Sequence, residues 1–277
     1  MLLAMTDLAH PSPRHLLMNL LRAADNGCLT AAEAVAAGEL FGISGNATRV
    51  ALARLAAAGL VDAKTRGSYR LGQAGVALDN EVSAWRSAEA RVVPWSGRWI
   101  AVLTTGLPRT DRAAWRARER ALSLLGLREL QGALFVRPDN LDGGVASVRA
   151  RLASLGVGGE TPVFCADQFD DALDQQARQL WNADELMRSY RDGCARLTQW
   201  LAGAASLPEG IAAKEAFLIG DHAIRQLVFD PLLPDPLIDA ALRRRYRDTV
   251  IAFDQQGRAI WSTFLAAARA RTTVSAA

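Results

Sequence analysis

The sequence predicts an α+β chain in three parts, and three observations support this. The N-terminal part holds three capped helical patterns and one rapidly alternating segment. Strand and helix patterns alternate in the middle part, and the last part is helical throughout. Half of the 277 residues are apolar, so the chain can bury a substantial core, and its length favours more than one domain. We therefore expect domains at residues 1–80, 81–168 and 169–277.

The first part begins with two helices that have clear start signals. Ser12 is the expected N-cap of the first helix, and Pro13 is its first residue. Thr30 followed by Glu33 is the pattern of a capping box. The second helix should therefore start there, and it should end at Gly42.

A third helix and a hairpin complete the first part. The third helix should begin after Ser44 and end at Gly59. The segment LVDAKTRGSYRLG at 60–72 alternates too fast for a helix and has Arg66 and Gly67 at a turn, which predicts a short hairpin. Three helices followed by a hairpin is the order of a winged helix-turn-helix, a DNA-binding fold.

The third helix has the surface that a DNA groove requires. On a helical wheel Leu52 and Leu55 lie on one side, while Asn46 and Arg49 face the other way among small residues. A slim face can enter the major groove, where arginine reads guanine and asparagine reads adenine, and the hairpin cations can neutralise flanking phosphates. The alternative is an ordinary surface helix of a bundle. We predict that double-stranded DNA is contacted by Ser44, Asn46, Thr48, Arg49, Arg54, Lys64, Arg66, Ser68, Tyr69 and Arg70.

The elements of the middle part follow one another in a known order. Strand patterns lie at 98–105 and 161–169, two more share residues 127–138 around a glycine, and helices are expected at 111–126 and 145–156. The order strand, helix, strand, strand, helix, strand is that of a ferredoxin-like fold.

Long helical patterns make up the last part. Asn182 and Glu185 form a capping-box pattern for one helix, residues 214–229 form another, and the stretch from Pro236 supplies the remainder. The prolines of DPLLPDP at 230–236 force a largely extended connection between the last two.

Several stretches, taken together, resemble the PaaX family of phenylacetic-acid-catabolism repressors. Besides the N-terminal unit, they are PWSGRW at 94–99, LWNADELMRSYR at 180–191 and FLIGDHAIRQLVFDPLLPDPLI at 217–238, and the resemblance covers nearly the whole chain. It implies a transcriptional repressor with a winged-helix N-terminal domain, a ferredoxin-like middle domain similar to the Cas2 fold, and a helical C-terminal domain. The outward residues of NATRVALARL at 46–55 are this chain's own, so the operator does not carry over.

The same resemblance implies release from DNA by an aryl-acyl coenzyme A effector, which is phenylacetyl-CoA in the type case. Arg188, Arg191 or Arg225 could hold the phosphates of such a ligand, while His222 donates a hydrogen bond. The alternative for His222 is a structural histidine that bridges two helices. We expect a homodimer, because a two-fold operator needs two recognition helices about one helical turn apart.

Two other classes of protein remain as alternatives. Cas2-type nucleases place an aspartate at the end of the first strand, but here Thr104 and Thr105 stand there and Asp111 falls on the next helix. Carboxylates would be needed to hold a metal ion and activate water, so we expect no enzyme, no metal and no cofactor. A protein-interaction module would keep the winged helix without affinity for DNA.

The cysteines and the termini indicate the compartment. Three cysteines, odd in number and far apart, argue against a disulfide framework. The N-terminal segment lacks a basic leader, and no apolar run approaches the roughly 20 residues of a spanning helix, so we expect a cytoplasmic protein. The net charge of +3 is weak evidence for a polyanionic partner, and only local clustering of cations counts.

Two patterns have two interpretations each. Trp95 and Trp99 could anchor the first strand of the middle part by packing, or one of them could line a pocket for an aryl group. The RRRYR run at 243–247 could touch DNA, although a solvated helix face is the commoner meaning of such a run.

Overall fold

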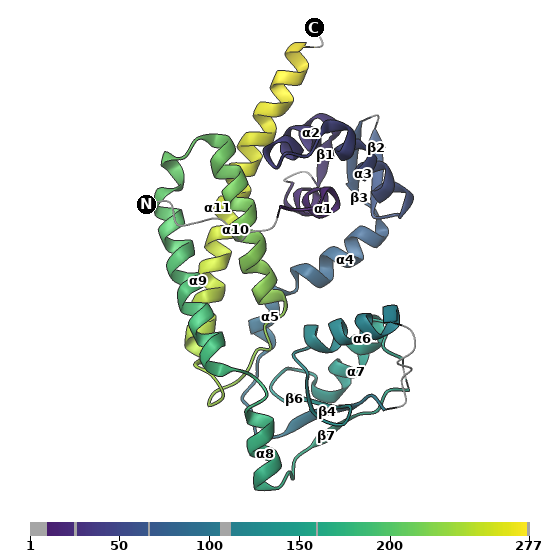
Figure 1. Cartoon of the computed structure of the whole chain (residues 1–277), viewed down its shortest axis with the longest axis vertical. Helices are drawn as coiled ribbons and strands as arrows, with labels where there is room; N and C mark the ends of the chain where they lie inside the picture. Colours follow the sequence, from purple (N-terminus) through teal and green to yellow (C-terminus); the bar gives the residue numbers. More distant parts are fainter. Residues whose placement is uncertain (1–9, 25–26, 66, 106–111, 159, 276–277) are drawn as a thin grey trace. The chain divides into compact units, whose positions relative to one another are not determined.

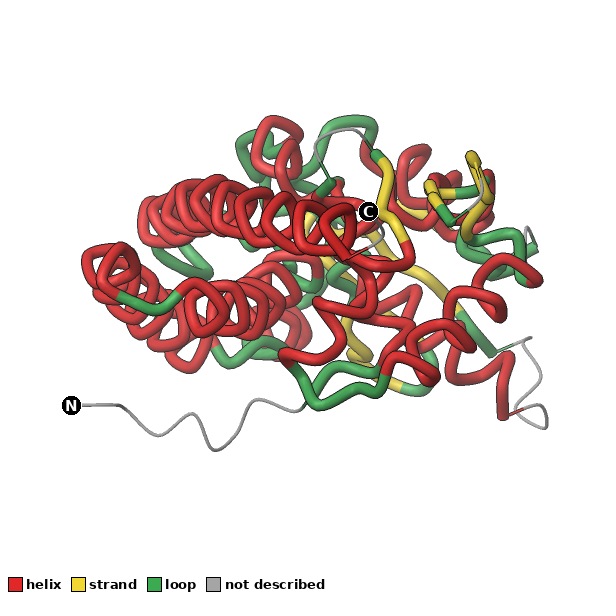
Figure 2. Tube along the Cα trace, turned by 90° about the horizontal axis from the view of Figure 1, so that it is seen from above, coloured by secondary structure: helices red, strands yellow, loops and turns green. Residues whose placement is uncertain are grey.

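The computed structural model describes the chain as two compact units, each built from several segments (Figure 1). The described residues are 10–24, 27–65, 67–105, 112–158 and 160–275. The first unit comprises residues 1–84, 196–224 and 249–277, and the second comprises 85–195 and 225–248. In the described part of the chain, the strands form two small sheets and helices make up most of the rest (Figure 2). The predicted division into three domains stays a prediction.

The first three helices of the first unit begin at the caps that the sequence predicts. The elements of this part are α1 Pro13–Ala23, β1 Cys28–Thr30, α2 Ala31–Leu40, α3 Gly45–Ala57, β2 Val61–Thr65, β3 Ser68–Leu71 and α4 Gln73–Ser83. The Ser12 side chain accepts a hydrogen bond from a backbone N–H of α1, and Ser44 does the same for α3. The capping box of Thr30 and Glu33 is present. Strand β1 was not predicted.

A three-stranded antiparallel sheet supports the hairpin. Its strand order is β1-β3-β2, so the central strand β3 pairs on both sides. Tyr69 of β3 lies opposite Leu29 of β1 and Ala63 of β2. The register shifts by one residue between Ala63 and Thr65, just before the turn. The hairpin predicted for this segment is confirmed, and β1 pairs with β3 so that Thr30, just before α2, lies opposite Ser68 near the turn.

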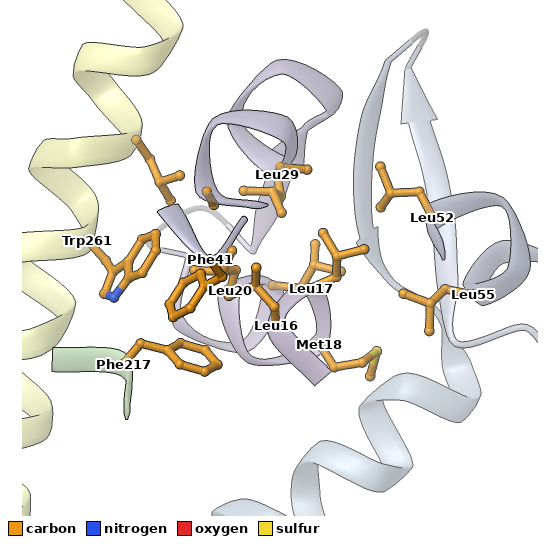
Figure 3. Packing of buried hydrophobic residues seen from close by; sticks show 14 of the residues in the cluster. Leu16, Leu17, Met18, Leu20, Leu29, Phe41, Leu52, Leu55, Phe217 and Trp261 are labelled. Carbon is orange, nitrogen blue, oxygen red and sulfur yellow. The ribbon is translucent and has the colours of Figure 1, made fainter. Parts of the chain in front are cut away.

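The core of the first unit joins N-terminal helices to segments from far along the chain (Figure 3). Leu16, Leu17 and Leu20 of α1 belong to one buried cluster with Phe217 and Trp261. The two aromatic residues come from α10 Glu209–Val228 and α11 Ala240–Ser275. The three N-terminal helices therefore share their core with the C-terminal helices.

A chain of aromatic contacts makes this connection. The ring of Phe217 lies with its centroid 5.2 Å from that of Phe41 and 6.3 Å from that of Trp261. Trp261 in turn meets Phe264 at 5.5 Å in a T-shaped arrangement. Such edge-to-face pairs add about 0.5–1.5 kcal/mol each to the free energy gained from burial alone.

The second unit contains the element order that the sequence predicts for the middle part. Its elements are α5 Trp85–Ala88, η1 Glu89–Arg91, β4 Trp99–Leu103, α6 Arg112–Leu124, β5 Arg128–Gln131, β6 Leu134–Pro138, α7 Gly144–Ser154, β7 Val163–Ala166 and α8 Asp171–Arg178. The sheet has the order β5-β6-β4-β7, and all neighbours are antiparallel. Apolar residues of β4, including Ile100 and Val102, form one buried cluster with Leu122 of α6 and Leu152 of α7.

The long helix α9 Ala183–Gly203 starts in the second unit and ends in the first, before η2 Ala204–Ser206, and α10 and α11 also have residues in both units. Its capping signal is confirmed in part, because the Asn182 side chain accepts from the backbone N–H of Glu185. Asp230–Pro236 forms no helix or strand, as the prolines require.

The two tryptophans of PWSGRW pack at the start of β4. Trp99 is almost fully buried, its indole N–H donates to Asp174 Oδ1 at 2.9 Å, and its ring stacks on Trp181 with centroids 6.3 Å apart. Trp95 meets Trp99 edge-on at 5.2 Å, and its own N–H donates to the carbonyl of Arg98. The packing interpretation is therefore confirmed for Trp99.

The interpretation of residues 243–247 as a solvated face is wrong for Arg243. Its side chain is 1% exposed and donates to Glu89 Oε1 at 2.8 Å and to the carbonyl of Leu233. A buried guanidinium needs such partners, because desolvation of an unpaired charge is costly. Nearby, Asp230 accepts from the hydroxyl of Tyr190 at 2.7 Å, and burial raises the pKa of the Asp230 carboxyl.

Two glycines of α9 provide a test of packing around Gly193 in the second unit, with Gly203, which belongs to the first unit, as the control. A Cβ atom on Gly193 would overlap with the buried ring of Tyr246, whose Cδ2 and Cζ would lie 3.1 and 3.2 Å away. We expect Gly193→Ala to lower the free energy of unfolding by about 1–3 kcal/mol. A Cβ on Gly203 would meet nothing within 4 Å, so Gly203→Ala should be neutral or stabilising by up to about 1 kcal/mol. Thermal unfolding followed by circular dichroism measures both, and equal midpoints would contradict this packing.

Candidate nucleic-acid interface

The outward face of α3 is exposed where the sequence predicts it to be. Asn46, Arg49 and Arg54 are exposed, whereas Leu52 and Leu55 are buried in the core of the first unit. The face also carries Val50, which is 41% exposed. The outer surface of α3 is therefore slim, polar and cationic.

Thr48 corrects one of the predicted DNA contacts. Its side chain is 2% exposed, and its hydroxyl donates to the carbonyl of Ser44 at 3.2 Å. Thr48 precedes Leu52 by four residues and Leu55 by seven, which places all three on the same face of a helix. The helical spacing is a signal that could have excluded Thr48, and we omit this residue from the interface.

Thr48 instead helps to position α3 against α2. A Cβ atom on Gly38 of α2 would lie 2.7 Å from Thr48 Oγ1, which is too close for any side chain larger than that of glycine. Gly38 therefore permits the close approach of the two helices. This contact, together with the burial of Leu52 and Leu55, holds the opposite face of α3 toward solvent.

The hairpin carries the second group of predicted contacts. Lys64 and Arg70 are exposed, while Ser68 and Tyr69 are half-buried, and Tyr69 packs against the core of the first unit. Arg66 lies outside the residues that the structure describes. Ser44 is exposed, and its hydroxyl is already used as the cap of α3.

The charge of this surface is strongly one-sided. Residues 44–72 hold five cations and a single acid, Asp62. The Arg70 guanidinium lies 3.9 Å from the Asp62 carboxylate, and both side chains are about half exposed. Exposed pairs of this kind contribute little and are screened by salt, so Arg70 remains free to exchange this partner for a phosphate.

The four predicted effector contacts are all exposed. Arg188 and Arg191 belong to α9, and His222 and Arg225 lie one helical turn apart on α10. Asp221, beside His222, makes a 2.7 Å hydrogen bond to His15 Nε2 of α1, a contact that no local sequence pattern indicates. The effector role of these residues stays a prediction.

Thr104 and Thr105, at the positions where a Cas2-type nuclease would need a carboxylate, differ in burial. Thr104 is buried and its hydroxyl donates to the carbonyl of Ala133 at 3.1 Å. Thr105 is exposed, and Asp111 lies outside the described residues. Within the described ranges, no group of three or more His, Cys, Asp or Glu side chains could hold a metal ion.

Residues 181–263 match the family model described as the PaaX-like protein C-terminal domain. The chain carries a PaaX-like C-terminal domain. This match confirms the resemblance stated from the sequence. Proteins with a PaaX-like C-terminal domain are transcriptional regulators, which indicates DNA as a partner.

The chain is also similar to a solved structure, that of the uncharacterized protein Rv0674 from Mycobacterium tuberculosis. The two share 25% sequence identity, the match covers 91% of this chain and 99% of the other, and the TM-score is 0.57. The similarity thus extends well beyond the PaaX-like C-terminal domain. No curated protein matches the chain significantly. None of the helices in the described ranges has the length and apolar character needed to cross a membrane.

An ion pair connects Glu33, at the start of α2, to Arg269 of α11. Arg269 lies after residue 263, where the PaaX-like match ends. Glu33 of α2 is 1% exposed, and its Oε2 accepts from the backbone N–H and the hydroxyl of Thr30, both at 2.7 Å. Its Oε1 accepts from Arg269 at 3.0 and 2.5 Å. The carboxylate therefore closes the capping box and binds a helix from the other end of the chain.

Removal of Arg269 should destabilise the first unit, because it leaves a buried carboxylate short of a partner. We expect Arg269→Met to lower the free energy of unfolding by about 1–3 kcal/mol. The loss is smaller than for a fully buried pair because the Arg269 side chain is 58% exposed. The double variant Glu33→Gln, Arg269→Met should recover part of this loss. Calorimetric midpoints of the two single variants and the double variant give the coupling energy, and strictly additive losses would show that the pair is not coupled.

Proposed function

We propose that the chain is a DNA-binding transcriptional repressor whose N-terminal part is a winged helix-turn-helix. The observation that carries the proposal is the exposed, slim and cationic face of α3 beside a basic antiparallel hairpin. The interface consists of residues from α3 and the hairpin: Ser44, Asn46, Arg49, Arg54, Lys64, Arg66, Ser68, Tyr69 and Arg70. Arg49 and Asn46 would read base edges, and the hairpin cations would bind phosphates.

The middle part supports the rest of the proposed architecture. A sheet of order β5-β6-β4-β7 with two helices packed by one shared core is what a ferredoxin-like, Cas2-like fold requires. Such a fold invites the nuclease alternative. The buried Thr104 at the end of β4, with its hydroxyl already donated to a carbonyl, favours regulation over metal-dependent cleavage.

We infer that two copies bind one operator in the cytoplasm, and that an aryl-acyl coenzyme A releases them. A two-fold operator would require a homodimer, because each chain supplies one recognition helix. The exposed cations Arg188, Arg191 and Arg225, with His222, are the proposed contacts for the phosphates and the thioester. A footprint on DNA flanking the gene, repeated with a panel of acyl-CoA esters, tests site, symmetry and effector together.

Substitution of Arg49 should change specificity, whereas substitution of Arg70 should change affinity. We expect Arg49→Ala to cost about 1–3 kcal/mol on the operator and to relax preference at one base pair. Arg70→Ala should weaken operator and random DNA alike and reduce the salt slope by about one unit. Arg196→Ala, which removes an exposed cation of α9, is the control and should leave both the specificity and the affinity for DNA unchanged. Fluorescence anisotropy at several salt concentrations measures all three variants.

Three results would contradict the proposed function. Equal losses on operator and random DNA for Arg49→Ala would remove its role in base reading. Absence of any salt-dependent affinity for DNA would favour a protein-interaction module. Cleavage of DNA or RNA in the presence of Mg²⁺ or Mn²⁺ would favour the nuclease.

A further inference from the structure

The first unit contains a cavity of about 740 Å³ behind the hairpin. Its walls come from the end of α1, strand β1, the hairpin strands β2 and β3, the start of α2 and the last turns of α11. Cavities of 300–1,000 Å³ are typical of sites for small organic ligands. The cavity therefore has the size of a ligand site, and one of its walls is the element that we assign to DNA.

One part of the cavity wall is apolar. Leu20 of α1 and Trp261 and Leu265 of α11 line it, together with Ala23 and Ala266 of the same two helices. All three large side chains belong to the buried core of the first unit, so this wall is firmly held. An aromatic or alkyl body of a ligand would gain free energy by leaving water for this surface.

The hairpin supplies the polar part of the wall. The Lys64 ammonium lies 3.6 Å from the Cys28 thiol, and both residues line the cavity with Thr65 and Ser68. Among the described residues, Lys64 makes no ion pair with an acid. Its charge is therefore available to an anion inside the cavity.

The other charges of the lining compensate one another. Glu33 and Arg269 both line the cavity, but they are paired with each other at 2.5 Å. Lys64 consequently leaves the lining with one uncompensated positive charge. A neutral ligand would leave this charge without a partner, and a cation would be repelled by it.

We propose that this cavity binds a small organic acid with an aromatic body. Its anionic group pairs with Lys64, and its ring packs against Leu20, Trp261 and Leu265. The threonine and serine hydroxyls of the hairpin can donate further hydrogen bonds to the anion. The site is distinct from the exposed residues on α9 and α10 assigned above to an acyl-CoA.

Occupancy of the cavity would act on DNA binding through Lys64. The same ammonium cannot neutralise a DNA phosphate and the acid of a bound ligand at full strength, so each ligand weakens the other. This step rests on the proposed function, whereas binding of the acid itself does not.

Fluorescence titration of the full chain tests binding without DNA. The probes are 1-anilinonaphthalene-8-sulfonate, which reports an apolar site by its emission, and 1-naphthoate as its competitor. We expect saturable binding of one anion per chain that 1-naphthoate displaces. The uncharged 1-naphthamide should compete about tenfold more weakly, because it lacks the charge that pairs with Lys64.

Two variants place the bound probe in the cavity, and one serves as control. Lys64→Gln should weaken the binding of both anions about tenfold while leaving 1-naphthamide unchanged. Ala266→Trp fills the cavity from an exposed position of α11 and should abolish the binding of all three probes. Arg196→Gln removes an exposed cation of α9 outside the lining and should bind all three probes as the unsubstituted protein does.

The three cysteines give an independent measurement of the same occupancy. Cys28 lines the cavity, Cys165 is exposed and Cys194 is buried. Saturating 1-naphthoate should slow alkylation of Cys28 by iodoacetamide about tenfold and leave Cys165 unaffected. Continued protection of Cys194 shows that each variant is folded.

The outcomes separate the cavity from the proposed function. Unsaturable fluorescence together with unprotected Cys28 would overturn the site, as would binding that neither Lys64→Gln nor Ala266→Trp weakens. If the acid binds as described while DNA does not, the site stands and the repressor is rejected. If both bind but 1-naphthoate leaves DNA affinity unchanged in the unsubstituted protein, the competition for Lys64 is rejected.

Discussion

The packing of Phe217 and Trp261 against the N-terminal helices is the contact on which the first unit depends. Helix α1 buries several leucines, but the short helices around it cannot cover them all. The two aromatic side chains, from α10 and α11, complete that core. Full burial of a large apolar side chain contributes about 1.5–3 kcal/mol, so these few contacts amount to a large part of the stability of an ordinary domain. The orientation of α3 depends on the same core through Leu52 and Leu55.

Local signals in the sequence were sufficient for most of the elements. Ser12, Thr30 and Ser44 each cap the helix that they were expected to start, because an N-cap acts within three residues of itself. The element order of the middle part was predicted for a similar reason, since hydrophobic periodicity changes at every boundary. Strand β1 escaped prediction because it is only three residues long and its pairing partner lies about forty residues further along the chain.

The misses among single residues arise from partners that are distant in sequence. Arg243 belongs to a run of cations that is typical of a solvated helix face, yet its buried guanidinium donates hydrogen bonds to Glu89 and to the carbonyl of Leu233. Glu33 was expected only as a capping residue, but it also binds Arg269. The exposed face of α3 could be predicted from the wheel alone, because burial on one helix repeats with the helical period. The cavity behind the hairpin could not be predicted, since its walls come from opposite ends of the chain.

The shared core also limits how a chain of this kind can diversify in evolution. Recombination in the linker after an independent DNA-binding module could exchange that module for another. Here a cut after β3 would separate α1 from the aromatic side chains that cover it, and the transferred piece would expose its leucines to water. Under the proposed function, new operator preferences would therefore arise mainly by residue replacement on the outer face of α3, with the two ends of the gene inherited together.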